Sequence, residues 1–171
     1  QEALWGPQTE RSRHNFPTGQ FMPLAIIRAL LNIKKAAAQA NLELNQIDEA
    51  KGKLIIEAID QLLALPDDDL RKDFPLKVYQ TGSGTQTNMN TNEVVANLAK
   101  RLNPDVTVLP NDDVNKGQSS NDVYPTAMNI VAVEALDQLL PAVQHLIDEL
   151  KAKQEQYWHV VKVGRTRSEE H

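Results

Sequence analysis

A long helical pattern runs from about residue 126 to residue 158 of the 171-residue chain, and it constrains the fold more than any other feature. Its apolar residues alternate in steps of three and four positions and are Val133, Leu136, Leu140, Val143, Ile147 and Leu150. This spacing is typical of the seam along which the helices of a bundle pack. At about 1.5 Å per residue the helix would be on the order of 45 Å long, and Pro141 is expected to kink it because proline removes a backbone donor. The earlier helical patterns are shorter, so we expect further chain or partner subunits to cover part of this seam.

Two amphipathic helices are expected in the first half of the chain. Apolar residues at helical spacing predict them over residues 22–39 and 48–65. Asp48 is a plausible N-cap for the second, because a side-chain carboxylate can accept from the first free backbone N–H groups. The basic pair Lys34 and Lys35 is interpreted as part of a solvated helix face.

Residues 93–102 continue the helical pattern, and Asn90 with Glu93 resembles a capping pair at its start. Residues 65–75 are expected to form an acidic loop bounded by prolines. The β-branched residues 106–108 favour a short strand. The sequence therefore predicts a mostly α protein.

The composition fits a globular domain and excludes several classes of function. Hydrophobic residues make up 41% of the chain and charged residues 24%, which is enough for an apolar core. The formal net charge of -5 leaves no basic field for a phosphate backbone, so no nucleic-acid partner is expected. There are no cysteines, the four histidines show no ligand spacing, and no apolar run approaches the roughly 20 residues of a membrane span. We therefore expect a cytoplasmic protein without a membrane partner.

Two clusters of neutral polar residues stand at expected helix starts. "TGSGTQTNMN", residues 81–90, offers the hydroxyls of Ser83 and Thr85, and its two glycines, Gly82 and Gly84, let a ligand approach the backbone. "GQSSNDVYPTAM", residues 117–128, offers the neutral groups of Ser119, Ser120 and Asn121. Such donors at a helix start suit a small anion such as a carboxylate, and two similar clusters suggest one site.

Helix capping explains the same residues without any ligand. For the first cluster, a polar helix cap and an anion site are equally weighted alternatives. For the second, Asn121 or Asp122 would be the cap, with Pro125 in the first turn of the helix. The first cluster is not a Walker loop, because the Gly-Lys-Ser/Thr ending is absent. It is not a Rossmann fingerprint either, because it lacks a second Gly-x-x-Gly step and a preceding strand pattern.

Three segments resemble signatures of class II fumarases, a branch of the fumarase/aspartase superfamily. They are "LWGPQTERSRHNFPTG", "FPLKVYQTGSGTQTNMNTNEVVAN" and "PNDDVNKGQSSNDVYPTAM", and they occur in the family's order over nearly the whole chain. Ser83, Gln86 and Ser120 favour the fumarases, because amino-acid lyases such as aspartase tend to carry Ala, Ser and Thr at these positions.

The resemblance implies a small N-terminal helical lyase domain, residues 1–118, and the first long helix of a fumarase/aspartase-type helix bundle, residues 119–171. It implies a homotetramer in which three subunits build each active site. The implied reaction is the reversible hydration of fumarate to (S)-malate, in which a base removes a proton beside a carboxylate and donors hold the dianionic intermediate. The positions that match the family's substrate-binding residues are Ser83, Thr85, Ser119, Ser120 and Asn121. No metal or organic cofactor is implied.

The chain departs from the family pattern at its end. The family's Gly-Arg-Thr-His motif ends here in Arg167, so a permanently charged side chain replaces the histidine that helps to orient the reacting water. The loop with the catalytic serine, and the lysine and asparagine after it, have no counterpart up to residue 171. We therefore expect substrate-binding residues without the catalytic base, and no catalytic residue is assigned.

A secondary anion site of some fumarases is also incomplete. Its basic residue and histidine correspond to Val106 and Leu109, so that only Asn111 and Asp112 remain of it.

The chain is treated as a possible fragment, because Gln1 opens it and the polar "GRTRSEEH" closes it. We expect the isolated chain to be inactive or nearly so. Two alternatives stay open: an aspartate ammonia-lyase-type enzyme of the same superfamily, and a non-catalytic helical assembly protein that associates through the seam from Leu136 to Leu150.

Overall fold

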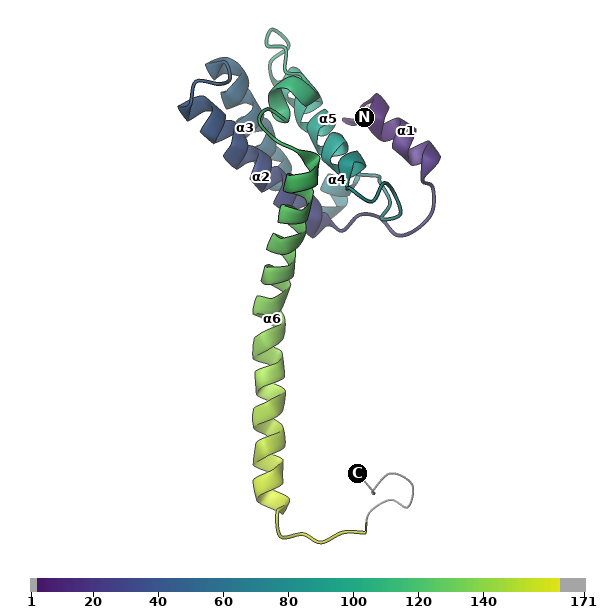
Figure 1. Cartoon of the computed structure of the whole chain (residues 1–171), viewed down its shortest axis with the longest axis vertical. Helices are drawn as coiled ribbons and strands as arrows, with labels where there is room; N and C mark the ends of the chain where they lie inside the picture. Colours follow the sequence, from purple (N-terminus) through teal and green to yellow (C-terminus); the bar gives the residue numbers. More distant parts are fainter. Residues whose placement is uncertain (1–2, 164–171) are drawn as a thin grey trace. The chain divides into compact units, whose positions relative to one another are not determined.

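The computed structural model describes residues 3–163, and these residues form helices and loops without a β-strand. In chain order the elements are α1 (Pro7–Asn15), α2 (Leu24–Glu43), α3 (Glu49–Leu63), α4 (Asp67–Arg71), α5 (Thr85–Leu102), the π-helix η1 (Pro110–Val114) and α6 (Ser120–Tyr157) (Figure 1). The predicted mostly α fold class is confirmed. The chain divides into two compact units, one that ends at Ala132 and one that begins at Val133. The domain boundary expected between residues 118 and 119 stays a prediction.

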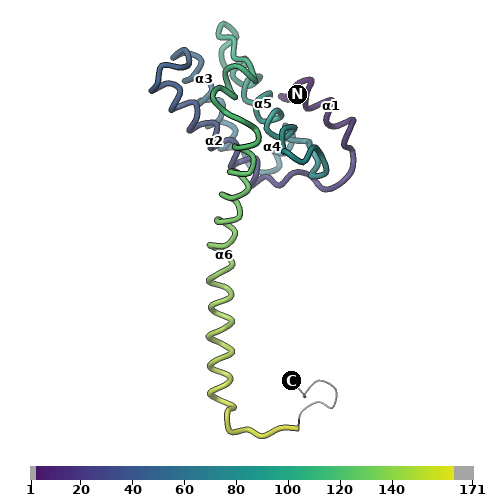
Figure 2. Tube along the Cα trace, viewed as in Figure 1, coloured from purple at the N-terminus to yellow at the C-terminus, as the bar shows by residue number. Residues whose placement is uncertain are grey.

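The core of the first unit lies among α2, α3 and α5, and α1 packs against α5. The path of the chain through these helices can be followed in Figure 2. The aliphatic side chains that are fully buried there include Leu30, Leu31, Ile55, Ile59, Leu62, Val94 and Val95. Each such burial contributes about 1.5–3 kcal/mol, which makes this interface the main source of stability in the unit.

The two amphipathic helices predicted in the first half of the chain are confirmed, with ends shifted by a few residues. Helix α2 spans Leu24–Glu43 and helix α3 spans Glu49–Leu63. Asp48 is the N-cap of α3, as predicted, since its carboxylate accepts from the backbone N–H groups of Ala50 at 3.0 Å and Lys51 at 3.2 Å. These bonds satisfy two of the amides that a helix start leaves unpaired.

Two local predictions are wrong. Residues 65–75 contain α4 rather than only loop, because one helical turn places Leu70 in the core, where it is fully buried, and acidic residues in that turn suit a helix N-terminus. Residues 106–108 form no strand, and Val108 is buried without a strand partner beside it. Helix α1 was not anticipated, although Pro7 at its first position is a recognised start signal.

The predicted capping pair of Asn90 and Glu93 is also wrong, because α5 begins well before both residues and buries them. The Glu93 carboxylate instead holds the start of α1. It accepts from the backbone N–H groups of Gly6 at 2.9 Å, Gln8 at 2.8 Å and Thr9 at 3.0 Å, and from the Thr9 hydroxyl at 2.6 Å. A carboxylate at a helix N-terminus is favourable because the helix dipole is positive there.

We predict that Glu93→Gln destabilises the chain by about 2 kcal/mol, because an amide NH₂ cannot accept the bonds that one carboxylate oxygen accepts and would leave buried N–H groups unpaired. Thermal or urea unfolding measures the change. Glu57→Gln is the matched control, since Glu57 is an exposed residue of α3. Equal stability of the two variants would contradict the assigned role of Glu93.

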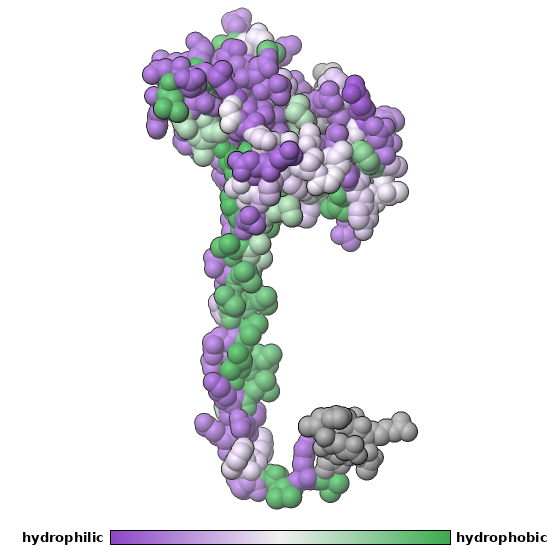
Figure 3. Space-filling model, in the orientation of Figure 1, coloured by the Kyte–Doolittle hydropathy of each residue, from purple (hydrophilic) through white to green (hydrophobic). Residues whose placement is uncertain are grey.

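Helix α6 spans Ser120–Tyr157, so it begins earlier than the sequence pattern indicated, and it continues through Pro141 as a helix. The kink expected at Pro141 stays a prediction. In the second unit the seam residues are exposed, and they include Leu136 at 47%, Leu140 at 60% and Ile147 at 39%. Figure 3 shows apolar side chains gathered along one side of α6 and hydrophilic ones along the other.

By length and composition alone, α6 is long and apolar enough to cross a membrane, with a mean hydropathy of 1.3 over 18 residues. This differs from the expectation that no segment approaches a membrane span, because mean hydropathy tolerates charged residues that interrupt an apolar run. Core helices of soluble proteins can be as long and as apolar, although they are mostly buried, whereas none of this part of α6 is buried. The one-sided pattern on α6 is that of a bundle helix, whose polar face stays in water.

If copies of the chain associate through the seam, the double variant Leu140→Asp, Ile147→Asp is predicted to abolish this self-association, because two carboxylates on the seam would be buried without partners in any bundle. Sedimentation velocity over a range of chain concentrations measures the change. The control is Gln138→Asp with His145→Asp, which adds the same carboxylates at exposed positions off the seam. Association that survives the seam variant and is lost in the control would place the contact elsewhere.

Candidate functional site

The two polar clusters meet where α5 and α6 begin. The Thr85 hydroxyl is hydrogen-bonded to Ser83 Oγ at 2.9 Å and to Ser120 Oγ at 3.1 Å. Thr85 is the first residue of α5, and Ser120 is the first residue of α6. The structure thus brings three of the predicted substrate-binding residues into one chain of hydroxyls, which we call the hydroxyl cluster. Both helix starts belong to the first compact unit.

The other two predicted residues lie beside this cluster. Asn121 and Ser83 line a small surface cavity of about 220 Å³, and both are exposed. Ser119 is the cap of α6, because its hydroxyl oxygen accepts from the backbone N–H of Asn121 at 3.3 Å. The predicted caps, Asn121 and Asp122, are wrong because the helix already begins at Ser120.

The electrostatics of this place favour a small anion. Two helix N-termini converge at the hydroxyl cluster, and each presents the positive end of its dipole and backbone N–H groups without a helical partner. The side chains of Ser83, Thr85 and Ser120 are neutral and can donate. The cluster can therefore bind a carboxylate through hydrogen bonds without exchanging a proton with it.

The segment before α5 holds its shape through Gln80 and Gly84. The Gln80 side chain accepts from Thr87 N at 3.1 Å and donates to Thr87 Oγ1 at 2.8 Å, so it caps the first turn of α5. Gly84 has a φ of 69°, a left-handed conformation that residues with a Cβ adopt only with strain. This turn directs the chain from the loop into the helix immediately before Thr85.

Tyr124 connects the two helix starts. A Cβ added to Gly84 would overlap the Tyr124 ring, so the ring packs directly on the glycine backbone. The Tyr124 hydroxyl donates to Met22 Sδ at 3.5 Å, and burial raises the pKa of this phenol. Tyr124 also lines the surface cavity with Ser83 and Asn121. It fixes the distance between α5 and α6 as a neutral side chain.

Asn111 and Asp112, predicted as remnants of a secondary anion site, lie on η1 and are exposed. Asn111 Nδ2 donates to Asp112 Oδ1 at 3.2 Å. They line a cavity of about 350 Å³ together with Glu93, and none of the described residues that line it is Lys, Arg or His. This lining does not favour an anion, and the role of the two residues stays a prediction.

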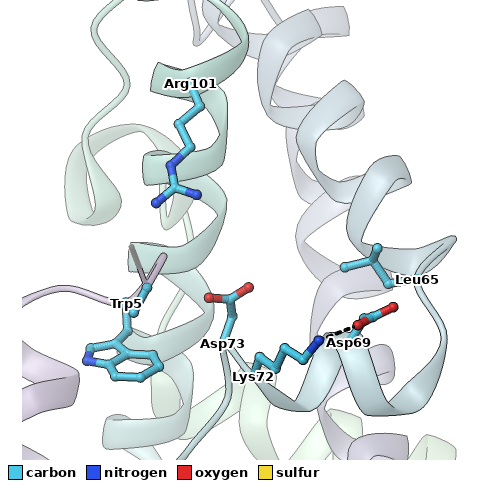
Figure 4. A pocket seen from close by; sticks show the side chains of 7 residues that line it. Trp5, Leu65, Asp69, Lys72, Asp73 and Arg101 are labelled. Atoms are coloured by element: carbon cyan, nitrogen blue, oxygen red, sulfur yellow. Dashed lines mark hydrogen bonds and ion pairs between the residues drawn. The ribbon is translucent and has the colours of Figure 1, made fainter. Parts of the chain in front are cut away.

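A larger cavity of about 530 Å³ is lined by Trp5, Lys72, Asp73 and Arg101, among others (Figure 4). Its charged groups already have structural roles. Lys72 is paired with Asp69 at 2.6 Å, and Asp73 accepts from the backbone N–H of Leu4 at 2.9 Å. No residue of the hydroxyl cluster lines this cavity.

Arg167, the residue that replaces the family's histidine, lies outside the residues that the structure describes. Within residues 3–163 there is no group of three or more His, Asp or Glu side chains that could hold a metal ion. The side chains of the candidate site carry hydroxyl and amide groups.

Three residues that support the site were not found from the sequence. Gln80 and Tyr124 stand inside the polar segments, but only the fold shows which atoms they contact. Lys34, interpreted as part of a solvated helix face, is fully buried, and that interpretation is wrong. A signal was available for Lys34, because it lies three and four residues after Leu31 and Leu30 in the apolar stripe of α2.

Comparison with known proteins identifies the class. The sequence model of a protein family described as lyase matches residues 1–170. The chain belongs to this lyase family.

The similar proteins agree with the resemblance to class II fumarases. A class II fumarate hydratase of Myxococcus xanthus is 53% identical over 172 residues, which cover 96% of this chain and 36% of the relative. One from Chlamydia pneumoniae is 51% identical over 173 residues, which cover 97% of this chain and 37% of the relative. The chain thus spans a little over a third of the length of these curated relatives.

Solved structures share the fold. The crystal structure of a class II fumarase from Schistosoma mansoni matches with a TM-score of 0.82 and 42% identity, over 96% of this chain and 36% of that chain. The structure of a fumarate lyase:delta crystallin from Brucella melitensis matches with a TM-score of 0.82 and 40% identity, over 96% of this chain and 40% of that chain.

We predict that Gly84→Ala destabilises the chain by at least about 1–2 kcal/mol, the usual cost of a left-handed residue with a Cβ. The new methyl group would also displace the Tyr124 ring. Thermal unfolding measures the change, and the control is Gly82→Ala, since a Cβ on Gly82 has open space around it. A Gly84→Ala variant as stable as the control would show that α5 and α6 do not depend on this contact.

Proposed function

We propose that this chain supplies substrate-binding residues to a fumarate hydratase, which catalyses the reversible hydration of fumarate to (S)-malate. The observation that carries the proposal is the hydrogen-bonded chain from Ser83 through Thr85 to Ser120 at two converging helix N-termini. It is supported by the relatives, which are named class II fumarate hydratases. The substrate class is a small dicarboxylate.

In this reaction the hydroxyl cluster would bind one carboxylate of the substrate. When a base removes the proton beside that carboxylate, negative charge accumulates on its oxygens, and fixed donors bind the intermediate more strongly than the substrate. Ser119 and Asn121, at the start of α6, lie beside the cluster and would complete its donors or hold the reacting water. Because these groups are preorganised by two helices, little rearrangement is needed as the charge develops.

The proton must be removed by a group outside this cluster. The five substrate-binding residues carry only hydroxyl and amide groups, which accept no proton near neutral pH. The family resemblance assigns the base to a serine loop without a counterpart up to residue 171. The isolated chain is therefore proposed to be inactive or nearly so.

The complete enzyme is proposed to be a homotetramer, with the exposed seam of α6 buried in its central bundle. The exposure of Leu136, Leu140 and Ile147 supports this, because such a stripe is stable in water only when another helix covers it. We also propose, from the sequence, that the complete enzyme acts in the tricarboxylic acid cycle and is located in the cytoplasm.

Two alternatives make different predictions. An aspartate ammonia-lyase-type enzyme would use the same hydroxyl cluster on aspartate. Ser83 and Ser120, which belong to the hydrogen-bonded chain, favour the fumarase side of the superfamily. A non-catalytic assembly protein would need only the exposed seam of α6.

The test is a chimera in which residues 1–163 replace the matching segment of the Myxococcus xanthus enzyme. We predict that the chimera hydrates fumarate, and that Thr85→Val lowers kcat/KM roughly 100-fold, the usual cost of removing one preorganised donor. Thr107→Val is the control, since Thr107 is an exposed threonine outside the cluster. The loss of fumarate absorbance measures the rate.

Each alternative has its own outcome in the same experiment. Consumption of aspartate instead of malate would assign the chain to the ammonia lyases. A chimera that assembles but acts on neither substrate would favour the assembly protein. Malate formation by the pure chain alone would contradict the proposed inactivity of the fragment.

A further inference from the structure

Lys34 is a buried cation that the proposed reaction does not use. It lies on α2 and is 0% exposed. Its ammonium group donates to two neutral acceptors, Asn115 Oδ1 and Gln118 Oε1, each at 3.2 Å. A buried lysine without a carboxylate partner is costly, so its position calls for a role beyond packing.

The acceptors of Lys34 belong to the turn that leads into α6. Asn115 Nδ2 donates to Gln118 O at 3.0 Å, and Gln118 Nε2 donates to Val114 O at 2.9 Å, so the two side chains fold this turn around the ammonium group. Gln118 is followed directly by Ser119 and Ser120. The turn therefore decides where the second polar cluster begins.

The same network reaches the helix of the first cluster. Asn115 Oδ1 also accepts from Asn88 Nδ2 at 3.0 Å and from Asn92 Nδ2 at 3.3 Å, and both asparagines lie on α5. One oxygen atom thus joins α2, α5 and the turn before α6. Among the described residues, the buried Oδ1 atoms of Asn88 and Asn92 have no hydrogen-bond donor, so Asn115 Oδ1 is the oxygen through which these asparagines reach the turn.

Lys34 is expected to lose its proton near neutral pH. Burial lowers its pKa to about 7, because water does not reach the ammonium group. The charged groups of the neighbouring elements that come next in the chain or face the turn form ion pairs with one another. Lys35 pairs with Asp60 at 2.6 Å, and Lys51 of α3 pairs with Asp113 of η1 at 3.0 Å.

The remaining charged groups near this network are Glu93 on α5 and Lys116 in the turn. Glu93 of α5 is bound to the start of α1, and Lys116 lies in the turn itself. The network around Lys34 is otherwise built from neutral amides.

We propose that Lys34 is a positioning residue for the substrate-binding cluster: its bonds to Asn115 and Gln118 hold the turn that places Ser119, Ser120 and Asn121 against Thr85. The role of the cluster in substrate binding rests on the proposed function, whereas the positioning of the cluster by Lys34 does not. Deprotonation of Lys34 weakens both bonds, because a neutral amine donates less strongly than an ammonium group, and this loosens the turn and shifts the start of α6.

The first test is a pH titration of the wild-type chain by nuclear magnetic resonance from pH 6 to 9. The ¹³Cε signal of Lys34 reports its own protonation, and the backbone amides of Thr85, Ser119, Ser120 and Asn121 report the cluster. We expect these amides to shift with the midpoint of Lys34, near pH 7. Cluster amides that do not follow the Lys34 midpoint would overturn the proposal.

The variant Lys34→Met separates the effect of Lys34 from any other pH-dependent change in the chain. It is expected to abolish the inflection at the cluster amides, and Lys35→Met, which changes the exposed neighbour, is expected to keep it. An inflection that persists in Lys34→Met would also overturn the proposal. If this variant does not fold, the wild-type titration still decides.

The titration contains no fumarate, so its outcome is independent of the proposed function. A chimera that fails to hydrate fumarate would leave the positioning role intact. Chemical shifts of the cluster amides that do not follow the Lys34 midpoint would leave the hydratase proposal intact.

Discussion

Helix α5 is buried along most of its length although its sequence is polar, so its side chains must find partners inside the protein. These partners lie on several different segments. Glu93 binds the start of α1, and Asn90 Nδ2 donates to Asp73 O at 3.2 Å. Asn88 binds Asn115, which precedes α6. Removing any of them leaves a buried polar group unpaired. The requirement to satisfy α5 therefore orders the segments around it, including those that carry the site.

The proposed site stands at two helix starts whose first turns are capped by the protein itself. Ser119 caps α6, and Gln80 caps α5, so the first turns of both helices are fixed before any ligand arrives. The hydroxyls of Thr85 and Ser120 then meet where both dipoles are positive. Capping and the proposed anion binding, which the sequence left as alternatives, are compatible, because the caps Gln80 and Ser119 leave the hydroxyls of Ser83, Thr85 and Ser120 in one chain.

In the second compact unit apolar groups are exposed, whereas in α5 polar groups are buried. Leu140 and Ile147 face solvent on α6, and a stripe of this kind is normally covered in a helix bundle. The chain spans a little over a third of the length of its curated relatives. The remaining length of such a relative, or further copies of the chain, would supply the missing helices, which connects the proposed assembly to the proposed activity.

The sequence by itself determined the helices with strong apolar periodicity, the Asp48 cap and the residues of both polar clusters, because these depend on local spacing and on side-chain chemistry. It misassigned Asn90, Glu93 and Lys34, whose polar side chains looked like caps or solvated groups. Only the tertiary structure decided that these residues are buried, that Glu93 serves α1, and that Thr85 meets Ser120. The physical reason is that hydrogen bonds between distant segments depend on how the helices pack, which no local pattern of residues encodes.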